Sequence, residues 1–196
     1  MRICFLGDSF INGTGDPHCL GWVGRVSAQA RASGCDVTCY NLGIRRNTSQ
    51  DIAARWQAEA ALRLPPEIAG MLVFSFGVND CCDEDGCRRV APEASVATTR
   101  SILSEAVRHR PTLMVGPPPI AAPDINHRIA ALSQALSNVC RDMGVPFLDA
   151  FTPLSANPVW MHETDTGDGA HPGAGGYDAL TALVSAWPDW RRAVSA

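Results

Sequence analysis

Short apolar runs alternate along the chain with longer segments in which apolar and polar residues recur at helical spacing. The short runs are β-rich and almost continuously apolar, which is typical of strands buried on both faces of a sheet. They predict strands at residues 2–6, 36–41, 70–75, 112–116 and 146–148. The longer segments predict helices at residues 21–33, 48–64, 92–108, 124–143 and 174–187. Thr48, Asp124 and Gly173 lie near plausible starts of three of these helices.

This succession of strands and helices predicts an α/β fold. Parallel neighbouring strands need crossover connections, and the intervening helices supply them. We therefore expect a doubly wound, parallel, five-stranded sheet with helices on both faces, which is a three-layer α/β/α sandwich. The chain has 196 residues, without repeats or an evident linker, so we expect a single domain over residues 1–196.

Polar residues gather where the predicted strands end, and in such sheets the functional site lies beyond the carboxyl ends of the strands. The relevant segments are Gly7-Asp8-Ser9, residues 41–48, Gly77-Val78-Asn79-Asp80 and Asp168-Gly169-Ala170-His171. Each segment alone is more often an ordinary turn or a helix cap. Their joint occurrence at one edge of the predicted sheet favours a functional site.

Together these residues have the chemistry that acyl transfer needs. A serine hydroxyl such as that of Ser9 becomes a nucleophile when a neighbouring base takes its proton, and histidine can do so near neutral pH. A carboxylate then holds the imidazole in the required tautomer. Asp168 and His171 are three residues apart, so one tight turn could bring them together. The amides of Ser9 and Gly43 and the side chain of Asn79 could stabilise the oxyanion, each typically by ~3 kcal/mol.

Composition and charge exclude several other functions. Hydrophobic residues make up 46% of the chain and charged residues 18%, as in a soluble globular protein. The net charge of −4 gives no reason to expect nucleic acid or an anionic membrane as a partner. All sixteen basic residues are arginine, which excludes a Walker A loop, a Schiff-base lysine and a Ser-Lys dyad. The first apolar run is too short for a signal peptide or a membrane span, so we expect a cytoplasmic protein without stable membrane insertion.

The cysteines do not follow a metal-binding pattern. There are eight, with no C-x-x-C pair, and Cys4, Cys39 and Cys140 lie in apolar runs, where they are expected to act as small hydrophobic residues. The one cluster that could bind a metal or form a disulfide consists of Cys81, Cys82 and Cys87. Adjacent cysteines chelate a single ion poorly, and His162-Glu163 lacks the second histidine of a H-E-x-x-H site, so no metal is expected.

The four polar segments, taken in order, resemble the sequence blocks of the SGNH hydrolases, also called the GDSL esterase/lipase family. The resemblance implies a flavodoxin-like fold, no metal or organic cofactor, and a Ser9 nucleophile with His171 as base and Asp168 as its partner. It also implies an oxyanion hole formed by Ser9, Gly43 and Asn79. The absence of G-x-S-x-G separates the chain from the usual α/β-hydrolases.

Asp165 is an alternative partner for the histidine. We prefer Asp168, because its spacing to His171 matches that of the family.

Two positions depart from the family pattern. Phe10 replaces the leucine of the first block, a change between apolar residues. Arg45 and Arg46 replace a small Ser-Gly pair, and their guanidinium groups could bind an anionic part of the substrate. The alternative is that they point into solvent or pair with surface acids. His18, in the loop after Ser9, is a further candidate for the mouth of the pocket.

We therefore expect a serine esterase that hydrolyses a carboxylic ester or thioester through an acyl-enzyme intermediate. Its substrate would be a small-molecule, lipid or carbohydrate ester. Acyl transfer to an alcohol differs only in which group attacks the acyl-enzyme. A non-catalytic ligand-binding module on the same fold is the other alternative, but such a module would be expected to lack one of the residues needed for catalysis, and all are present. The sequence does not specify the substrate or the oligomeric state.

Overall fold

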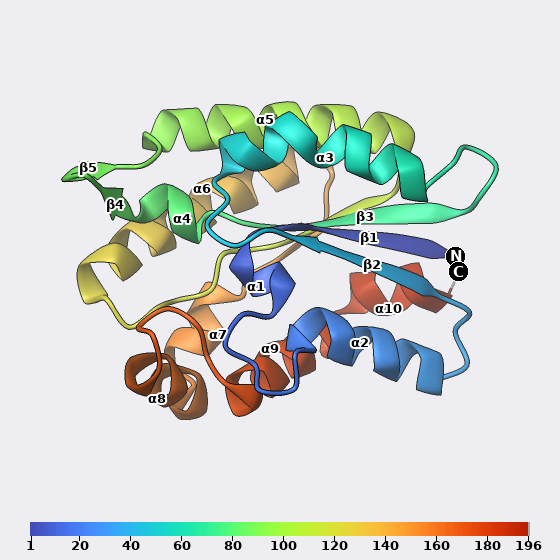
Figure 1. The fold of residues 1–196 in the computed structure, drawn as a ribbon. Coiled ribbons are helices and arrows are strands. Elements are labelled where there is room, and N and C mark those ends of the chain that lie inside the picture. Colours follow the sequence, from blue (N-terminus) through green and yellow to red (C-terminus); the bar gives the residue numbers. More distant parts are fainter. Residues whose placement is uncertain (196) are drawn as a thin grey trace.

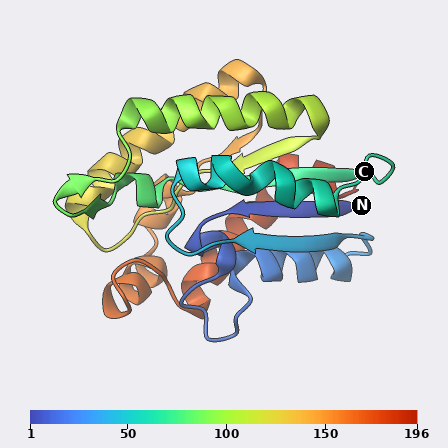
Figure 2. The same cartoon turned by 45° about the horizontal axis from the view of Figure 1, so that its top comes forward.

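A parallel sheet lies between two layers of helices (Figures 1 and 2) in the computed structural model, which describes residues 1–195. Its strands are β1 (Arg2–Gly7), β2 (Thr38–Gly43), β3 (Gly70–Ser75), β6 (Thr112–Val115) and β7 (Phe147–Leu148), in the spatial order β2-β1-β3-β6-β7. All four neighbouring pairs are parallel. The predicted three-layer α/β/α sandwich with a flavodoxin-like sheet is thus confirmed. The strand order changes direction between β1 and β3, which is where this fold binds its ligands.

The helices cover both faces of the sheet, as Figure 1 shows. One face carries α3 (Ser49–Arg63), α5 (Pro92–His109) and α6 (Pro123–Met143), and the other carries α2 (Gly21–Ala32), α9 (Ala174–Ala186) and α10 (Pro188–Ser195). The five predicted helices, α2, α3, α5, α6 and α9, are all present, and their ends differ from the predicted ones by no more than one residue. Thr48 caps α3 through a capping box with Asp51, and Gly173 is the N-cap of α9, as the sequence indicates.

Several short elements escape the pattern of apolar positions, because one or two turns are too short to show a period. They include α1 (Ser9–Asn12), α4 (Val78–Cys81), α7 (Phe151–Ser155), α8 (Pro158–Thr166) and the hairpin of β4 (Asp83–Glu84) and β5 (Cys87–Arg88). The sequence nevertheless marks the start of α8: Asn157 accepts hydrogen bonds from two backbone amides, and Pro158 follows at the first helical position. α10 was not predicted as a helix either.

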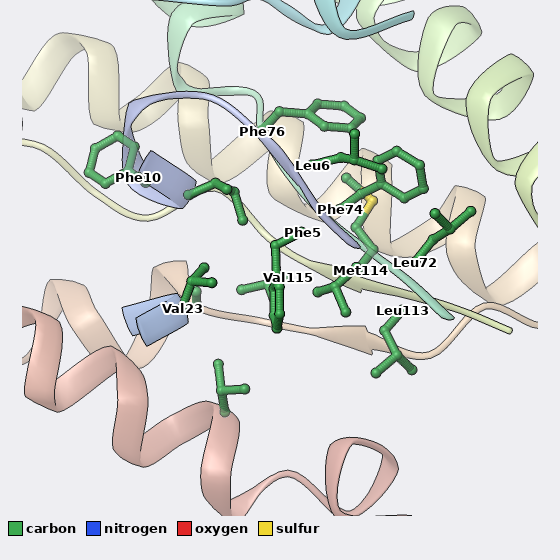
Figure 3. Close-up of a cluster of buried hydrophobic side chains, with 14 of the residues drawn as sticks. Phe5, Leu6, Phe10, Val23, Leu72, Phe74, Phe76, Leu113, Met114 and Val115 are labelled. Carbon is green, nitrogen blue, oxygen red and sulfur yellow. The ribbon is translucent and has the colours of Figure 1, made fainter. Parts of the chain in front are cut away.

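The core lies on both sides of β1 and β3. Figure 3 shows Phe5 and Leu6 on β1 packed among side chains of the neighbouring strands, including Phe74 and Met114. Burial of both faces, predicted for all strands, is wrong for the two edge strands: β2 leaves Thr38 and Asn41 exposed, and both residues of β7 are only half-buried. The strand β2 also begins two residues later than predicted, at Thr38 instead of residue 36.

The cysteines behave mainly as packing residues. All eight are free thiols, and Cys4, Cys81 and Cys140 are buried. Burial raises the pKa of each of these three thiols to about 12, so they stay protonated at neutral pH. In residues 1–195, no helix has the length and apolar character that a membrane span requires.

Candidate active site

The turn after β1 sets the position of Ser9. Gly7 ends the strand so close to β3 that a Cβ on it would collide with the Ser75 carbonyl, so only glycine fits. Asp8 then caps α1, and its Oδ1 accepts the backbone N–H of Phe10 at 3.0 Å. Ser9 is thereby the first residue of α1, directly beyond the carboxyl end of β1 at the switch point of the sheet.

A continuous line of hydrogen bonds connects Ser9, His171 and Asp168. The Nε2 atom of His171 lies 2.7 Å from Ser9 Oγ, and its Nδ1 atom lies 2.8 Å from Asp168 Oδ2. The other carboxylate oxygen of Asp168 accepts the backbone amides of Ala170 and His171, which closes the tight turn that the sequence suggests. Asp165 lies exposed on α8 instead. This arrangement can pass a proton from the serine hydroxyl to an imidazole whose tautomer is fixed by a carboxylate.

The carboxyl group of Asp168 is held in its charged form. Partial burial pushes its pKa up, but the hydrogen bonds from the backbone and ring of His171 and from the Ala170 amide outweigh this effect and lower the pKa to about 2. Asp168 therefore remains an acceptor for the imidazole N–H throughout the neutral range.

The loop that carries Asp168 and His171 is supported from both sides. Glu163 on α8 accepts the amides of Gly175 and Gly176 at 3.1 and 2.6 Å, and so caps α9 directly after the loop. The hydroxyl of Tyr177 donates to the Thr14 carbonyl at 2.7 Å, which ties α9 to the loop after Ser9. Glu163 is not among the residues predicted from the sequence; the signal for it is the glycine-rich start of α9, which has no capping side chain of its own.

A buried carboxylate organises the loop after α1, and it too was missed. Asp16 accepts the backbone amides of His18, Leu20 and Gly21 and pairs with Arg25, which also pairs with Asp178 on α9. Burial pushes the pKa of Asp16 up, but these partners hold it well below the usual range. The dipeptide Asp16-Pro17 by itself predicts only a turn. The contacts of the Asp16 carboxylate, including the one with Arg25, are not visible in the sequence.

The three predicted oxyanion donors differ in whether their N–H groups already have a hydrogen-bond acceptor in the protein. The Ser9 amide begins α1 and has no acceptor within residues 1–195. Asn79 Nδ2 donates to the Asn47 carbonyl at 3.0 Å and lies 3.4 Å from Asp8 Oδ2. The Gly43 amide donates to Asn41 Oδ1 at 3.0 Å.

Gly43 also has a packing role. A Cβ at this position would collide with the backbone of Asn12 in α1, so glycine allows β2 to approach the helix that begins with Ser9. Asn41 reinforces this contact, because its Nδ2 donates to the Ile11 carbonyl at 2.7 Å.

The candidate substrate-binding residues are separated by the structure. Arg45 is exposed, and its guanidinium lies 3.4 Å from Asp168 Oδ2. Arg46 points elsewhere and pairs with Glu84 of the β4–β5 hairpin. His18 is exposed in the loop after α1, where its backbone amide donates to Asp16. Of the three residues, Arg45 is the one for which the structure shows a contact with the Ser9–His171–Asp168 group.

The cysteine cluster does not form a chelating group. Cys81 is buried, while Cys87 is exposed on the hairpin. Among residues 1–195, no group of three or more His, Cys, Asp or Glu side chains is placed to hold a metal ion.

A cavity of about 430 Å³ lies away from these residues. Its lining includes Trp56 and Leu64 on or next to α3, Leu72 on β3 and Arg110 before β6. These positions are near the amino ends of β3 and β6, whereas Ser9 lies beyond the carboxyl end of β1. The volume of this cavity thus says nothing about the site beside Ser9.

The fold is an α/β sandwich, and a serine, a histidine and an acidic residue meet beyond the carboxyl ends of its strands. The sequence matches the GDSL-like lipase/acylhydrolase family over residues 5–179, so the chain belongs to this family. It is a hydrolase that acts on ester bonds. The resemblance inferred from the four sequence segments is thereby confirmed.

Solved structures with the same fold include a lipase/acylhydrolase, an acetylxylan esterase and an alpha/beta hydrolase. A lipase/acylhydrolase from Enterococcus faecalis is similar with a TM-score of 0.78 and 24% identity, covering 93% of this chain and 92% of the other. Axe2, an acetylxylan esterase from Geobacillus stearothermophilus, is similar with a TM-score of 0.74 and 18% identity, covering 93% and 91%. LAE5, an alpha/beta hydrolase from the metagenome of Lake Arreo in Spain, has a TM-score of 0.72 and 18% identity, covering 93% and 92%. A comparison with curated proteins gave no match.

Asp8, next to Ser9, has a perturbed pKa that yields a testable consequence. Burial raises the pKa of its carboxyl to about 7; the Phe10 amide opposes this shift, and the charge of Asp80 adds to it. A raised native pKa means that the folded protein binds a proton between pH 4 and 7 that the unfolded chain does not. The stability of the wild type should therefore fall as the pH rises through this window, by up to about 1.4 kcal/mol per pH unit from this group.

Asp8→Asn should remove this part of the pH dependence, because asparagine cannot ionise and is an equally good N-cap. The measurement is the free energy of urea unfolding of both proteins at several values between pH 4 and 8. The difference in stability should shift in favour of the variant as the pH rises. Parallel curves for the two proteins would show that Asp8 does not titrate in this way.

Proposed function

We propose that the protein hydrolyses carboxylic esters or thioesters through an acyl-enzyme intermediate on Ser9. The observation that carries this proposal is the hydrogen-bonded line from Ser9 Oγ through His171 to Asp168, with distances of 2.7 and 2.8 Å. His171 takes the proton of Ser9 as its Oγ attacks the ester carbonyl, and then gives it to the leaving alcohol. Asp168 stabilises the imidazolium that forms in between. Water, activated by His171, releases the acid and restores Ser9.

The oxyanion of the tetrahedral intermediate would bind at the start of α1. No acceptor for the Ser9 amide is found within residues 1–195, which leaves this N–H for the oxyanion. Asn79 Nδ2 is the second donor: its bond to the Asn47 carbonyl positions it, and its other N–H would exchange the long 3.4 Å contact with Asp8 Oδ2 for the oxyanion. Gly43 is the third donor. Its amide would bind the substrate oxygen either in place of Asn41 Oδ1 or together with it.

The comparisons support these roles without fixing the substrate. Axe2 structures include catalytic mutants in which one serine or one histidine is replaced by alanine. Acetyl esters of carbohydrates are one substrate class to test first, together with longer acyl esters of lipids. Transfer of the acyl group to an alcohol would use the same residues, with an alcohol in place of the water.

Ser9→Ala should abolish turnover, with a loss of at least about 10⁴-fold in kcat, because it removes the hydroxyl that is hydrogen-bonded to His171. Purified wild type and variant would be assayed on p-nitrophenyl acetate, butyrate, octanoate and palmitate. A preference for acetate supports a deacetylase, and a preference for octanoate or longer supports a lipid substrate. If no ester is cleaved and an organophosphonate does not label Ser9, the chain binds its ligand without this chemistry.

The two candidate acids provide a matched pair of variants. Asp168→Asn should lower kcat by about 10³–10⁴-fold, because an amide no longer fixes the tautomer of His171. Asp165→Asn makes the same change three residues away on the exposed face of α8 and should leave kcat unchanged. The steady-state kinetics of both variants decide between them. The assignment is wrong if Asp165→Asn, and not Asp168→Asn, stops turnover.

Arg45 is proposed as a contact for substrates that carry a negative charge, because its exposed guanidinium stands beside Asp168 with one contact of 3.4 Å. Arg45→Ala should raise KM about tenfold for an anionic ester such as p-nitrophenyl hemisuccinate and leave KM for p-nitrophenyl acetate unchanged. An equal KM for wild type and variant on both esters would exclude this role.

A further inference from the structure

Arg46 adopts a backbone conformation that its residue type disfavours. Its φ is +71°, in the left-handed region where glycine is favoured and a long side chain is strained. The Asn47 amide donates to the Ile44 carbonyl at 3.2 Å, so Arg46 is the third residue of a tight turn that needs a positive φ at this position. Such strain persists only where the surroundings hold it, and it often marks a functional site.

Arg46 is held by two residues: Glu84 on the β4–β5 hairpin and Arg89 directly after it. Glu84 Oε1 pairs with the Arg46 guanidinium, and Arg89 donates from its Nη1 to the Arg46 carbonyl at 2.9 Å. Arg89 also binds the other oxygen of Glu84 through its Nε at 3.2 Å. The three residues thus form a closed polar group, which we call the Arg46 clamp.

The clamp acts next to the oxyanion donors proposed above. The residue after Arg46 is Asn47, whose carbonyl accepts Asn79 Nδ2 at 3.0 Å and whose side chain accepts Arg55 Nε at 2.7 Å. The same loop begins with Gly43. Any shift of the turn at Arg46 therefore moves the acceptor that orients the Asn79 carboxamide.

The hairpin and this loop are joined by polar bonds across a hollow. A cavity of about 390 Å³ separates the hairpin from the first turn of α3, with Thr48 and Asp51 on one side and Asp85, Cys87 and Arg88 on the other. The hairpin projects from α4 beyond the strand ends at the left of Figure 1. Its contact with the loop consequently depends on the polar bonds of Glu84 and Arg89.

We propose that Glu84 and Arg89 are positioning residues for catalysis, which keep the strained turn at Arg46 in place and so orient Asn79 in the oxyanion hole. This inference rests on the proposed function of Ser9 and Asn79. The side-chain hydrogen bonds of Glu84 and Arg89 go to Arg46 and to each other, and not to Ser9, His171 or Asp168, so the loss of the clamp should reduce kcat and leave KM nearly unchanged.

The hairpin offers a matched control. Asp83 is adjacent to Glu84 and pairs with Arg128 on α6 at 2.6 Å, on the side away from Arg46. Glu84→Gln and Asp83→Asn each replace a carboxylate in an exposed ion pair by an amide. Only the first acts on the strained turn.

Glu84→Gln should lower kcat about tenfold, with KM unchanged, because a displaced supporting group commonly costs this much. Asp83→Asn should retain the kcat of the wild type. In an Arg46→Gly background the turn is no longer strained, so adding Glu84→Gln should have no further effect on kcat. Equal losses for Glu84→Gln and Asp83→Asn, or the same tenfold loss in the Arg46→Gly background, would overturn the proposal.

Hydrogen exchange of the loop gives a readout that does not need an ester substrate. The amides of Ile44, Asn47 and Ser49 are hydrogen-bonded, so a peptide over residues 43–49 should be protected in the wild type. It should exchange faster in Glu84→Gln and not in Asp83→Asn. Unchanged exchange in Glu84→Gln refutes the clamp even if Ser9 is an active nucleophile. A Ser9→Ala variant as active as the wild type refutes the proposed function instead.

Discussion

The hydrogen bond between Ser9 and His171 links two residues that are 162 positions apart, and much of the structure serves to make it possible. Ser9 is fixed by the close approach of β1 and β3 at Gly7, and His171 by the turn that Asp168 closes. A hydrogen bond of this kind fails with a displacement of less than an ångström. Both ends must therefore be held by rigid elements and not by loops alone.

Buried or partly buried charge supplies much of that rigidity. Asp16 accepts three backbone amides and pairs with Arg25, which also pairs with Asp178 on α9, so the loop after Ser9 is tied to the helix after His171. Glu163 plays the equivalent part at the start of α9. Each of these carboxylates accepts at least two backbone amides, and so fixes two or more points of a loop or helix start at once.

The loop between β2 and α3 follows a different principle. Polar bonds reach it from three directions: from Asn79 and Asp80 on α4, from Arg55 on α3, and from Arg89 directly after the hairpin. Such a loop can keep an unfavourable φ at Arg46 only while these bonds persist. It can also respond to small changes at the surface more readily than the packed core can.

Local sequence patterns determined the sandwich architecture, the five long helices and the residues at the strand ends, because burial and helical periodicity are properties of neighbouring residues. The same patterns placed Ser9, Asp168 and His171 at one edge of the sheet, and the family blocks assigned them their roles. Tertiary structure alone decided that β2 is an edge strand, that the Gly43 amide is engaged by Asn41, and that Arg45 and Arg46 point to different acids. Asp16, Glu163 and Glu84 gain their importance from partners on other elements or from the meeting of segments distant in sequence. No periodicity within one segment records those contacts.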